Sequence, residues 1–179
     1  IVVTFFSPSG FELRKNYVLA DGVYYLPPDI PARMKHFIDA IAPSKVIFIK
    51  YEIWPNLIAI LHQKKISKYL IAATFREDQV YFKSRGRFFK RALEQFDHIF
   101  TQNQASFNIL QHHNVLNSSS AGDPRFDRVW KTQENASNNE IIQQFKGDAV
   151  LLIAGSSWPE EEALLASVLL PKNGKLIIA

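Results

Sequence analysis

The sequence has no cysteine and only seven glycines among its 179 residues. Without cysteine, the chain can form neither a disulfide framework nor a metal site with thiolate ligands. The glycines stand singly, so the sequence contains no GxGxxG turn, no phosphate-binding P-loop and no GxSxG nucleophile elbow. These absences argue against an NAD-dependent dehydrogenase, a P-loop kinase and an α/β-hydrolase.

Long apolar runs and metal-ligand spacings are also missing. No apolar run reaches the roughly 18 residues that would span a bilayer, and we expect no signal peptide within this sequence. The five histidines show no paired ligand spacing, and His112 and His113 would point apart on a helix. We therefore expect no metal and no cofactor. The chain starts without Met in a strand pattern and ends in an apolar run, so we expect an interior piece of a longer protein.

Short apolar runs alternate with helical patterns along most of the chain. This alternation is typical of right-handed βαβ units and predicts an α/β fold with a mainly parallel sheet. The predicted strands cover residues 1–6, 23–26, 46–49, 69–73, 98–101, 149–154 and 175–178, with a further short strand within 118–127.

Composition predicts where the first domain ends. Residues 131–139 are polar, with hardly any apolar side chain, which is typical of an inter-domain linker. We predict a first domain over residues 1–131, a linker over 132–146 and the truncated beginning of a second α/β domain over 147–179. In that second domain a helix is expected over residues 163–170.

The stretch from Lys45 to Asn56, KVIFIKYEIWPN, is the clearest candidate site. Its apolar half predicts a strand buried on both faces, and Pro55 suits the first turn of a following helix. Glu52 then lies at the carboxyl end of a strand, where open parallel sheets bind ligands. The alternative is that Glu52 only caps the helix and that Trp54 belongs to the core.

Other polar groups are expected at strand ends. The turn from Ser7 to Gly10 opens a helix whose free N–H groups suit an anion or a sugar, although a plain cap explains it equally well. Arg76 follows another strand, and its guanidinium pairs well with carboxylate or phosphate. A sugar or phosphate site needs such a mixture of groups. The strand-end set is Ser9, Glu52, Asn56, Arg76, Asp123 and Ser156.

All of the formal net charge of +4 lies in residues 75–91. This segment, termed here the basic aromatic segment, has six basic and two acidic residues, whereas the rest of the chain has fifteen of each. It also holds Phe75, Tyr81, Phe82, Phe88 and Phe89. Basic residues among aromatics suit an anionic membrane surface, a phosphorylated lipid or a nucleic acid backbone. The alternative is an amphipathic helix with phenylalanines in the core.

Six motifs together carry a family resemblance. In order and spacing they resemble the 3-deoxy-D-manno-octulosonic acid (Kdo) transferases of lipopolysaccharide synthesis. The resemblance implies a GT-B fold of two Rossmann-like domains, in which the first receives a lipid A precursor and the second binds CMP-Kdo. It also implies that the catalytic base is a glutamate outside this chain, and that this piece cannot catalyse alone. The motifs are TFFSPSGFE, YLPPD, KYEIWPN, the strand-end Arg76, AGDPRFD and AGSSWPEEE.

The resemblance assigns expected roles to individual residues. Glu52 supports catalysis, and Ser156 and Ser157 lie on the donor side. The acceptor-binding residues are Ser9, Gly10, Trp54, Asn56 and Arg76. Because the acceptor is a lipid, we expect the basic aromatic segment to dock on the anionic cytoplasmic face of the bacterial inner membrane, with an N-terminal anchor outside this chain. The docking residues are Arg85, Arg87, Lys90, Arg91, Phe88 and Phe89.

The sequence departs from the family pattern at two places, and two rival functions stay open. Glu77 and Asp78 replace a Leu-Ser pair that often follows the arginine, and Pro124 replaces a Thr or Leu. One rival is a non-enzymatic module that binds RNA or an acidic partner through the basic aromatic segment, although we expect no nucleic acid partner. The other is a different GT-B enzyme, such as a sugar-nucleotide epimerase, which shares the fold but gives no reason for that segment.

Overall fold

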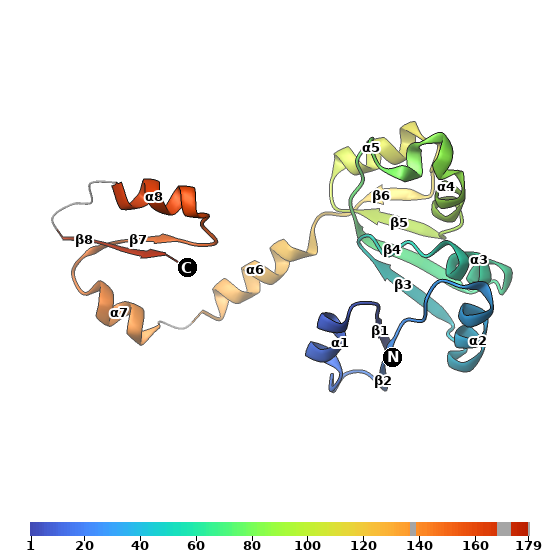
Figure 1. Cartoon of the computed structure of the whole chain (residues 1–179), viewed down its shortest axis with the longest axis horizontal. Coiled ribbons are helices and arrows are strands. Elements are labelled where there is room, and N and C mark those ends of the chain that lie inside the picture. The colour runs from blue at the N-terminus through green and yellow to red at the C-terminus, as the bar shows by residue number, and fades with distance from the viewer. Residues whose placement is uncertain (137–138, 168–172, 179) are drawn as a thin grey trace. The chain divides into compact units, whose positions relative to one another are not determined.

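A computed structural model describes residues 1–136, 139–167 and 173–178 (Figure 1). The chain forms two compact units, residues 1–128 and 129–179. Every strand pair in the described residues is parallel, and helices connect the strands. The predicted α/β class with a mainly parallel sheet is therefore confirmed.

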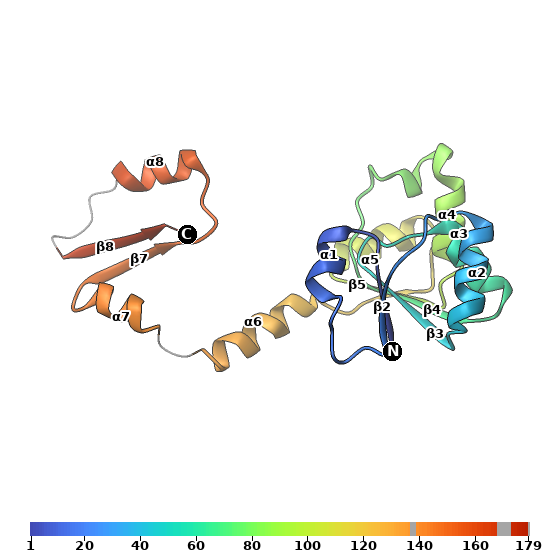
Figure 2. The same ribbon diagram turned by 60° about the horizontal axis from the view of Figure 1, so that its bottom comes forward.

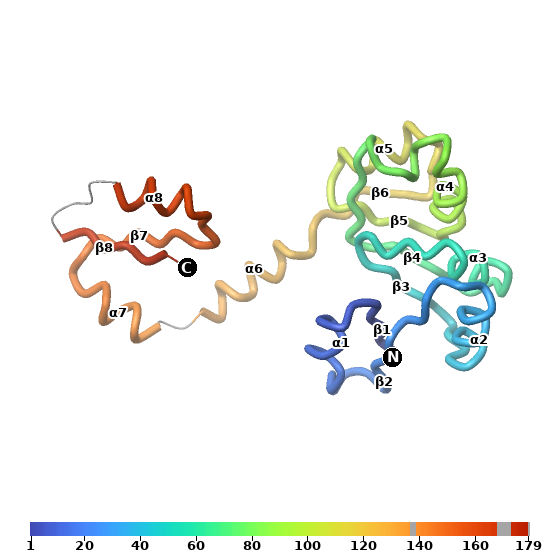
Figure 3. The backbone as a smooth tube through the Cα atoms, viewed as in Figure 1, coloured from blue at the N-terminus to red at the C-terminus, as the bar shows by residue number. Residues whose placement is uncertain are grey.

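The first unit contains two parallel sheets. β1 pairs with β2, and a four-stranded sheet has the order β3-β4-β5-β6. Figure 3 traces the backbone from β1 through α1 to β2 and on to the larger sheet. The elements are β1 Val2–Phe5, α1 Pro8–Arg14, β2 Gly22–Tyr25, α2 Pro31–Ile41, β3 Lys45–Ile49, α3 Pro55–Gln63, β4 Ser67–Ala73, η1 Val80–Phe82, η2 Ser84–Gly86, α4 Arg87–Glu94, β5 His98–Thr101, α5 Gln104–His112 and β6 Ser118–Ser120.

The hydrophobic core lies on one face of the larger sheet. The strands of this sheet, β3 to β6, lie side by side in chain order. Right-handed crossovers between such strands place the connecting helices on the same face. Phe48, Leu70 and Ile99 come from three neighbouring strands and are buried in one cluster with residues of α2 to α5. Figure 2 shows α2, α3 and α4 along this side. The helical members are Met34, Ile38, Leu57, Ile58, Ile60, Leu61, Ala92, Leu93 and Leu110.

The prediction that residues 46–49 are buried on both faces is wrong. Phe48 is buried, but Ile47 and Ile49 are 56% and 54% exposed. Successive strand side chains point to opposite faces, and the helices pack on the side of Phe48. An apolar run therefore marks a strand without showing that both of its faces are covered.

The second unit contains one β-α-β arrangement, and helices occupy part of the predicted linker, residues 132–146. β7 Val150–Ala154 pairs in parallel with β8 Gly174–Ile178, and α8 Pro159–Ser167 follows β7. α6 Pro124–Glu134 runs across the boundary after Arg128, and α7 Glu140–Lys146 occupies half of the predicted linker. The Asn139 side chain caps α7 by accepting a hydrogen bond from Ile142 N. Residues 168–170 of the predicted helix lie outside the described residues.

Within the described ranges, no helix has the length and hydrophobicity that crossing a bilayer requires.

Candidate functional site

The turn after β3 presents Glu52 at the carboxyl end of the larger sheet. Lys50 has a positive φ of 60°, which turns the chain away from the strand. Two short backbone contacts close the turn, from Glu52 N to Ile49 O at 3.3 Å and from Ile53 N to Tyr51 O at 2.8 Å. Ile53 is buried, whereas Glu52 is exposed. The buried Ile53 side chain therefore anchors the turn, and the Glu52 carboxylate just before it is exposed to solvent.

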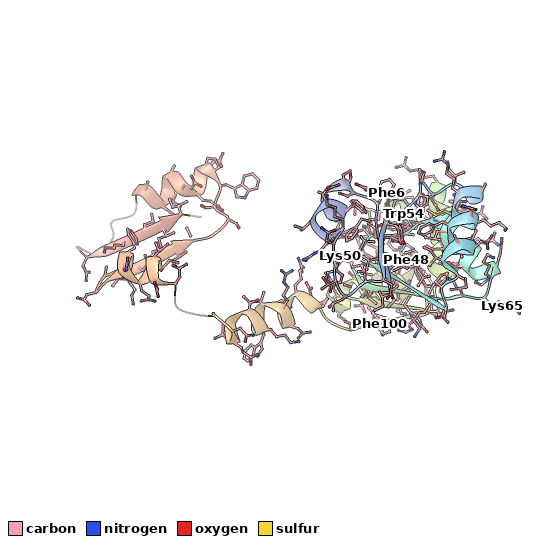
Figure 4. The ribbon with its side chains drawn as sticks, turned by 90° about the horizontal axis from the view of Figure 1, so that it is seen from below. Phe6, Phe48, Lys50, Trp54, Lys65 and Phe100 are labelled. Carbon is pink, nitrogen blue, oxygen red and sulfur yellow. The ribbon has the colours of Figure 1, made fainter. Side chains whose placement is uncertain are left out.

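Trp54 holds the Glu52 carboxylate. Its indole Nε1–H donates to Glu52 Oε2 at 2.7 Å, and its ring packs against the core cluster. The Phe6 ring, just after β1, lies 4.8 Å from the Trp54 ring, centroid to centroid (Figure 4). Trp54 is the N-cap residue of α3, and no side chain of that residue caps the helix. Glu52 therefore binds an indole, and the alternative that it caps α3 is wrong.

The acceptor for the first turn of α3 is Asp29, a residue that the sequence reasoning missed. Asn56 N donates to Asp29 Oδ2 at 3.0 Å, and Leu57 N donates to Asp29 Oδ1 at 2.9 Å. Asn56 Nδ2 donates to the Asp29 backbone oxygen at 2.6 Å. The backbone N–H and one side-chain N–H of Asn56 therefore already have a protein partner. In the sequence, Asp29 stands between prolines ahead of α2, so its position gives no sign of a contact with α3.

Ser9 and Gly10 lie in the first turn of α1. The Ser9 and Ser7 hydroxyls are 2.6 Å apart. A Cβ on Gly10 would stand 2.7 Å from the Phe5 ring, so glycine lets α1 pack directly on β1. Ser7 at the N-cap makes no side-chain cap, and the helix has only seven residues.

Arg76 lies after β4 and makes its contacts within its own loop. Its side chain is 72% exposed, with Nε 3.4 Å from Asp78 Oδ1. Its backbone N–H donates to Gln79 Oε1 at 3.0 Å. The end of β4 is joined to the Glu52 turn by a different residue, because Thr74 Oγ1 donates to the Tyr51 hydroxyl at 2.9 Å. No distinctive pattern in the sequence marked Tyr51 or Thr74.

An ion pair closes the turn after β6. Arg125 Nε donates to both Asp123 oxygens, at 2.8 and 3.1 Å, and its backbone N–H donates to Oδ1 at 3.0 Å. The Arg125 guanidinium, helped by the charge of Lys50, holds the pKa of the Asp123 carboxyl below its usual value. Asp123 was predicted as a strand-end group, but its arginine partner was not. Pro124 starts α6 between them.

The basic aromatic segment forms two short 3₁₀ turns and α4. Phe75 is buried, while Tyr81, Phe82 and Phe89 are half-buried against the core. Burial raises the pKa of the Tyr81 hydroxyl. The amphipathic alternative therefore describes most of these aromatic rings. Phe88 differs, since it is 55% exposed. The exposed arginines beside it are Arg85, Arg87 and Arg91.

Acidic side chains occupy the start of α8 in the second unit. Ser156 has a positive φ of 57°, and Ser157 Oγ donates to Glu162 Oε1 at 3.3 Å. Glu161 Oε2 accepts from Trp158 N at 2.8 Å. The carboxylates therefore already use one N–H and one hydroxyl of this turn.

No group of three or more His, Cys, Asp or Glu side chains in the described ranges could hold a metal ion.

Solved structures share this architecture. A putative UDP-N-acetylglucosamine 2-epimerase from Listeria monocytogenes aligns over 99% of this chain and 53% of its own, with a TM-score of 0.60 and 13% identity. A UDP-N-acetylglucosamine 2-epimerase from Rickettsia bellii aligns over 98% of this chain and 60% of its own, with a TM-score of 0.54 and 11% identity. Identity this low shows the fold alone, which is that of a GT-B-type Rossmann-like domain.

The family is shown by sequence. The family model for 3-deoxy-D-manno-octulosonic-acid transferase (kdotransferase) matches residues 1–128. A 3-deoxy-D-manno-octulosonic acid transferase of Haemophilus influenzae is 40% identical over 68 residues, which are 37% of this chain and 16% of that protein. The chain therefore belongs to the Kdo transferase family of glycosyltransferases, and it spans only part of the relatives it matches.

Proposed function

We propose that this chain supplies the acceptor-binding part of an enzyme that transfers Kdo from CMP-Kdo to a hydroxyl of a lipid A precursor. The observation that supports it most is the exposed Glu52 carboxylate, fixed by Trp54 at the carboxyl end of β3 in a member of this family. An ionised carboxylate accepts hydrogen bonds from sugar hydroxyls. Glu52 thus orients the acceptor, and the general base comes from outside this chain.

Other strand-end residues complete the acceptor site. Ser9 and Gly10 offer a hydroxyl and a close backbone at the start of α1, and Trp54 forms an apolar wall with Phe6. Arg76, with its largely exposed guanidinium, binds an acceptor phosphate. Asn56 contributes mainly through its amide oxygen, because one N–H of its side-chain amide already donates to Asp29. The reaction needs no metal or other cofactor.

The donor side is proposed for Ser156 and Ser157. Three glutamates stand in the first turn of α8. Their charge disfavours a phosphate directly at this helix N-terminus, so we assign these serines to uncharged donor groups such as hydroxyls. The isolated chain should accordingly not bind CMP measurably, and calorimetry on residues 1–179 tests this.

We place the protein at the cytoplasmic face of the inner membrane, where its lipid acceptor resides, with an anchor outside this chain. The exposed Phe88, Arg85, Arg87 and Arg91 support docking by this surface. Lys90 and Phe89 contribute less to docking. Lys90 Nζ lies 3.7 Å from Glu94 Oε1, and the Phe89 ring is half-buried.

Replacing Glu52 by Gln in the full-length enzyme tests the proposal. Glutamine keeps an oxygen for the Trp54 indole but removes the charge, so turnover should fall by about tenfold or more while the unfolding temperature stays nearly constant. Glu140→Gln, in the exposed first turn of α7, is the control and should keep its activity. Normal turnover of Glu52→Gln would contradict the proposed role.

Polyanion binding through the basic aromatic segment is the second candidate function, favoured by the same exposed arginines. Non-specific binding of RNA would weaken steeply with salt and show no preference for a lipid A precursor. Filter binding of RNA and co-sedimentation with vesicles, each measured across a salt series, separate the two functions.

A further inference from the structure

We propose that Asp29 is a positioning residue, which holds the turn carrying Glu52 and Trp54 in place relative to β2. This inference rests on the proposed function, because it matters for catalysis only if Glu52 orients the acceptor. Asp29 lies in the connection between β2 and α2, more than twenty residues from the turn it contacts.

Asp29 accepts every hydrogen bond of this contact, through both its side chain and its backbone. Its two carboxylate oxygens accept the first free N–H groups of α3, from Asn56 at 3.0 Å and from Leu57 at 2.9 Å. Its backbone oxygen accepts from the Asn56 amide at 2.6 Å. Three hydrogen bonds thus join two segments that the chain brings together only through folding.

A remote acceptor is needed because α3 cannot cap itself. The N-cap is usually a Ser, Thr, Asp or Asn whose oxygen accepts from the first turn, but here it is Trp54. The indole has only a donor, and it is already used on Glu52. A cap from a neighbouring residue would only satisfy the free N–H groups of α3. A cap from the β2–α2 connection also holds the start of α3 in position relative to that connection.

The segment that carries Asp29 is stiff. Pro27 and Pro28 precede it and Pro31 begins α2, so three proline rings restrict the backbone within five residues. Ile30 N donates to Pro28 O at 2.6 Å, and Met34 N donates to Ile30 O at 2.9 Å. Met34 is fully buried. The carboxylate is therefore held by a rigid connection anchored in the core.

The restraint reaches Glu52 in two steps. Pro55 is buried directly before the capped residues, and Trp54 precedes it. If the first turn of α3 moves, the indole moves, and with it the donor that fixes the Glu52 carboxylate. Asp29 also neutralises the positive end of α3, so an anionic group of the substrate binds elsewhere.

Nuclear magnetic resonance of the ¹⁵N-labelled chain tests the positioning role. The indole N–H signal of Trp54 is assigned by its loss in Trp54→Phe, and Trp130 and Trp158 serve as internal references. In Asp29→Ala we expect the Trp54 signal to move towards the position of an indole hydrogen-bonded to water, with both references unchanged. Asp29→Asn keeps one accepting oxygen and should move the signal less. Asp39→Ala removes another surface carboxylate of the same domain and should leave it in place.

Each outcome decides between positioning and simple capping. A lower unfolding temperature of Asp29→Ala with an unmoved Trp54 signal would show an ordinary cap and overturn the proposal. If Asp29→Ala does not fold, the smaller displacement in Asp29→Asn is decisive, and no displacement overturns it. These spectra do not depend on activity. If Glu52→Gln keeps full turnover, the proposed function fails while the positioning result still stands.

Discussion

At the scale of single residues, the partner of a polar group decides what the group can do. Glu52 and Asn56 stand four residues apart at one strand end. Glu52 is exposed and its carboxylate accepts from an indole, whereas Asn56 donates its backbone N–H and one side-chain N–H to Asp29. The sequence ranked both together, because residue type and position were all it offered. Only the folded structure shows that the Glu52 carboxylate is exposed, whereas Asn56 already donates to Asp29.

Gly86 gives a residue-scale prediction of stability. It is buried at the start of α4, and a Cβ there would lie 1.6 Å from the carbonyl oxygen of Val80. Because this atom is backbone, the turn must shift, so Gly86→Ala should destabilise the first unit by about 1–3 kcal/mol, the usual range for overpacking. Gly155→Ala is the control, since nothing lies within 4 Å of its added Cβ. Urea unfolding of both variants measures the difference, and equal stabilities would contradict this account.

At the scale of elements, local pattern predicted the strands well. Apolar runs placed β3 and β4 within about two residues of their observed bounds, and Pro55 marked the start of α3. The pattern did not show that β1 and β2 form a sheet apart from β3 to β6, or that Ile47 and Ile49 face solvent. Strand pairing and the covering of a face depend on residues distant in sequence, which no local window contains. The Asp29 cap was missed for the same reason.

An ion triad between α2 and α3 gives a prediction of pH dependence. Lys35 Nζ and Lys64 Nζ lie 2.7 and 2.6 Å from the Asp39 carboxylate and lower its pKa to about 2. A folded pKa below the unfolded value of about 4 stabilises the fold at neutral pH, and this contribution is lost as pH falls from about 4 through 2. Wild type should therefore melt slightly above Asp39→Asn at pH 7. The gap should close over that acidic range.

Salt provides the check on this triad. All three side chains are solvent-accessible, so screening should shrink the difference in unfolding temperature between wild type and Asp39→Asn at pH 7. Calorimetric melting at low and high ionic strength measures it. A difference that persists unchanged in high salt and at pH 2 would mean that packing, and not charge, separates the two proteins.

At the scale of the whole molecule, charge and apolar exposure coincide on one segment of the first unit. The basic aromatic segment holds all of the net charge, and its Phe88 ring is exposed among arginines. Its other aromatic rings serve the core, through edge-to-face contacts such as Phe75 with Tyr81. The sequence overstated the number of rings that could enter a membrane, because composition counts side chains without showing which way they point. A docking role therefore depends mainly on charge, with one ring for insertion.

Vesicle binding tests that role with a charge-matched control. Replacing Arg85, Arg87, Lys90 and Arg91 by Gln should weaken binding to anionic vesicles at low salt by several kcal/mol, at about 1 kcal/mol per basic residue near the surface. Replacing Arg14, Lys15, Arg33 and Lys65 by Gln removes the same charge from other exposed positions and should weaken binding much less. Phe88→Ser should lower binding further without changing its salt dependence, because the ring contributes by apolar insertion. Co-sedimentation with anionic and neutral vesicles across a salt series measures all three variants. Equal loss in the two charge variants would show attraction to net charge alone, and wild type that ignores anionic vesicles at low salt would rule out docking by this surface.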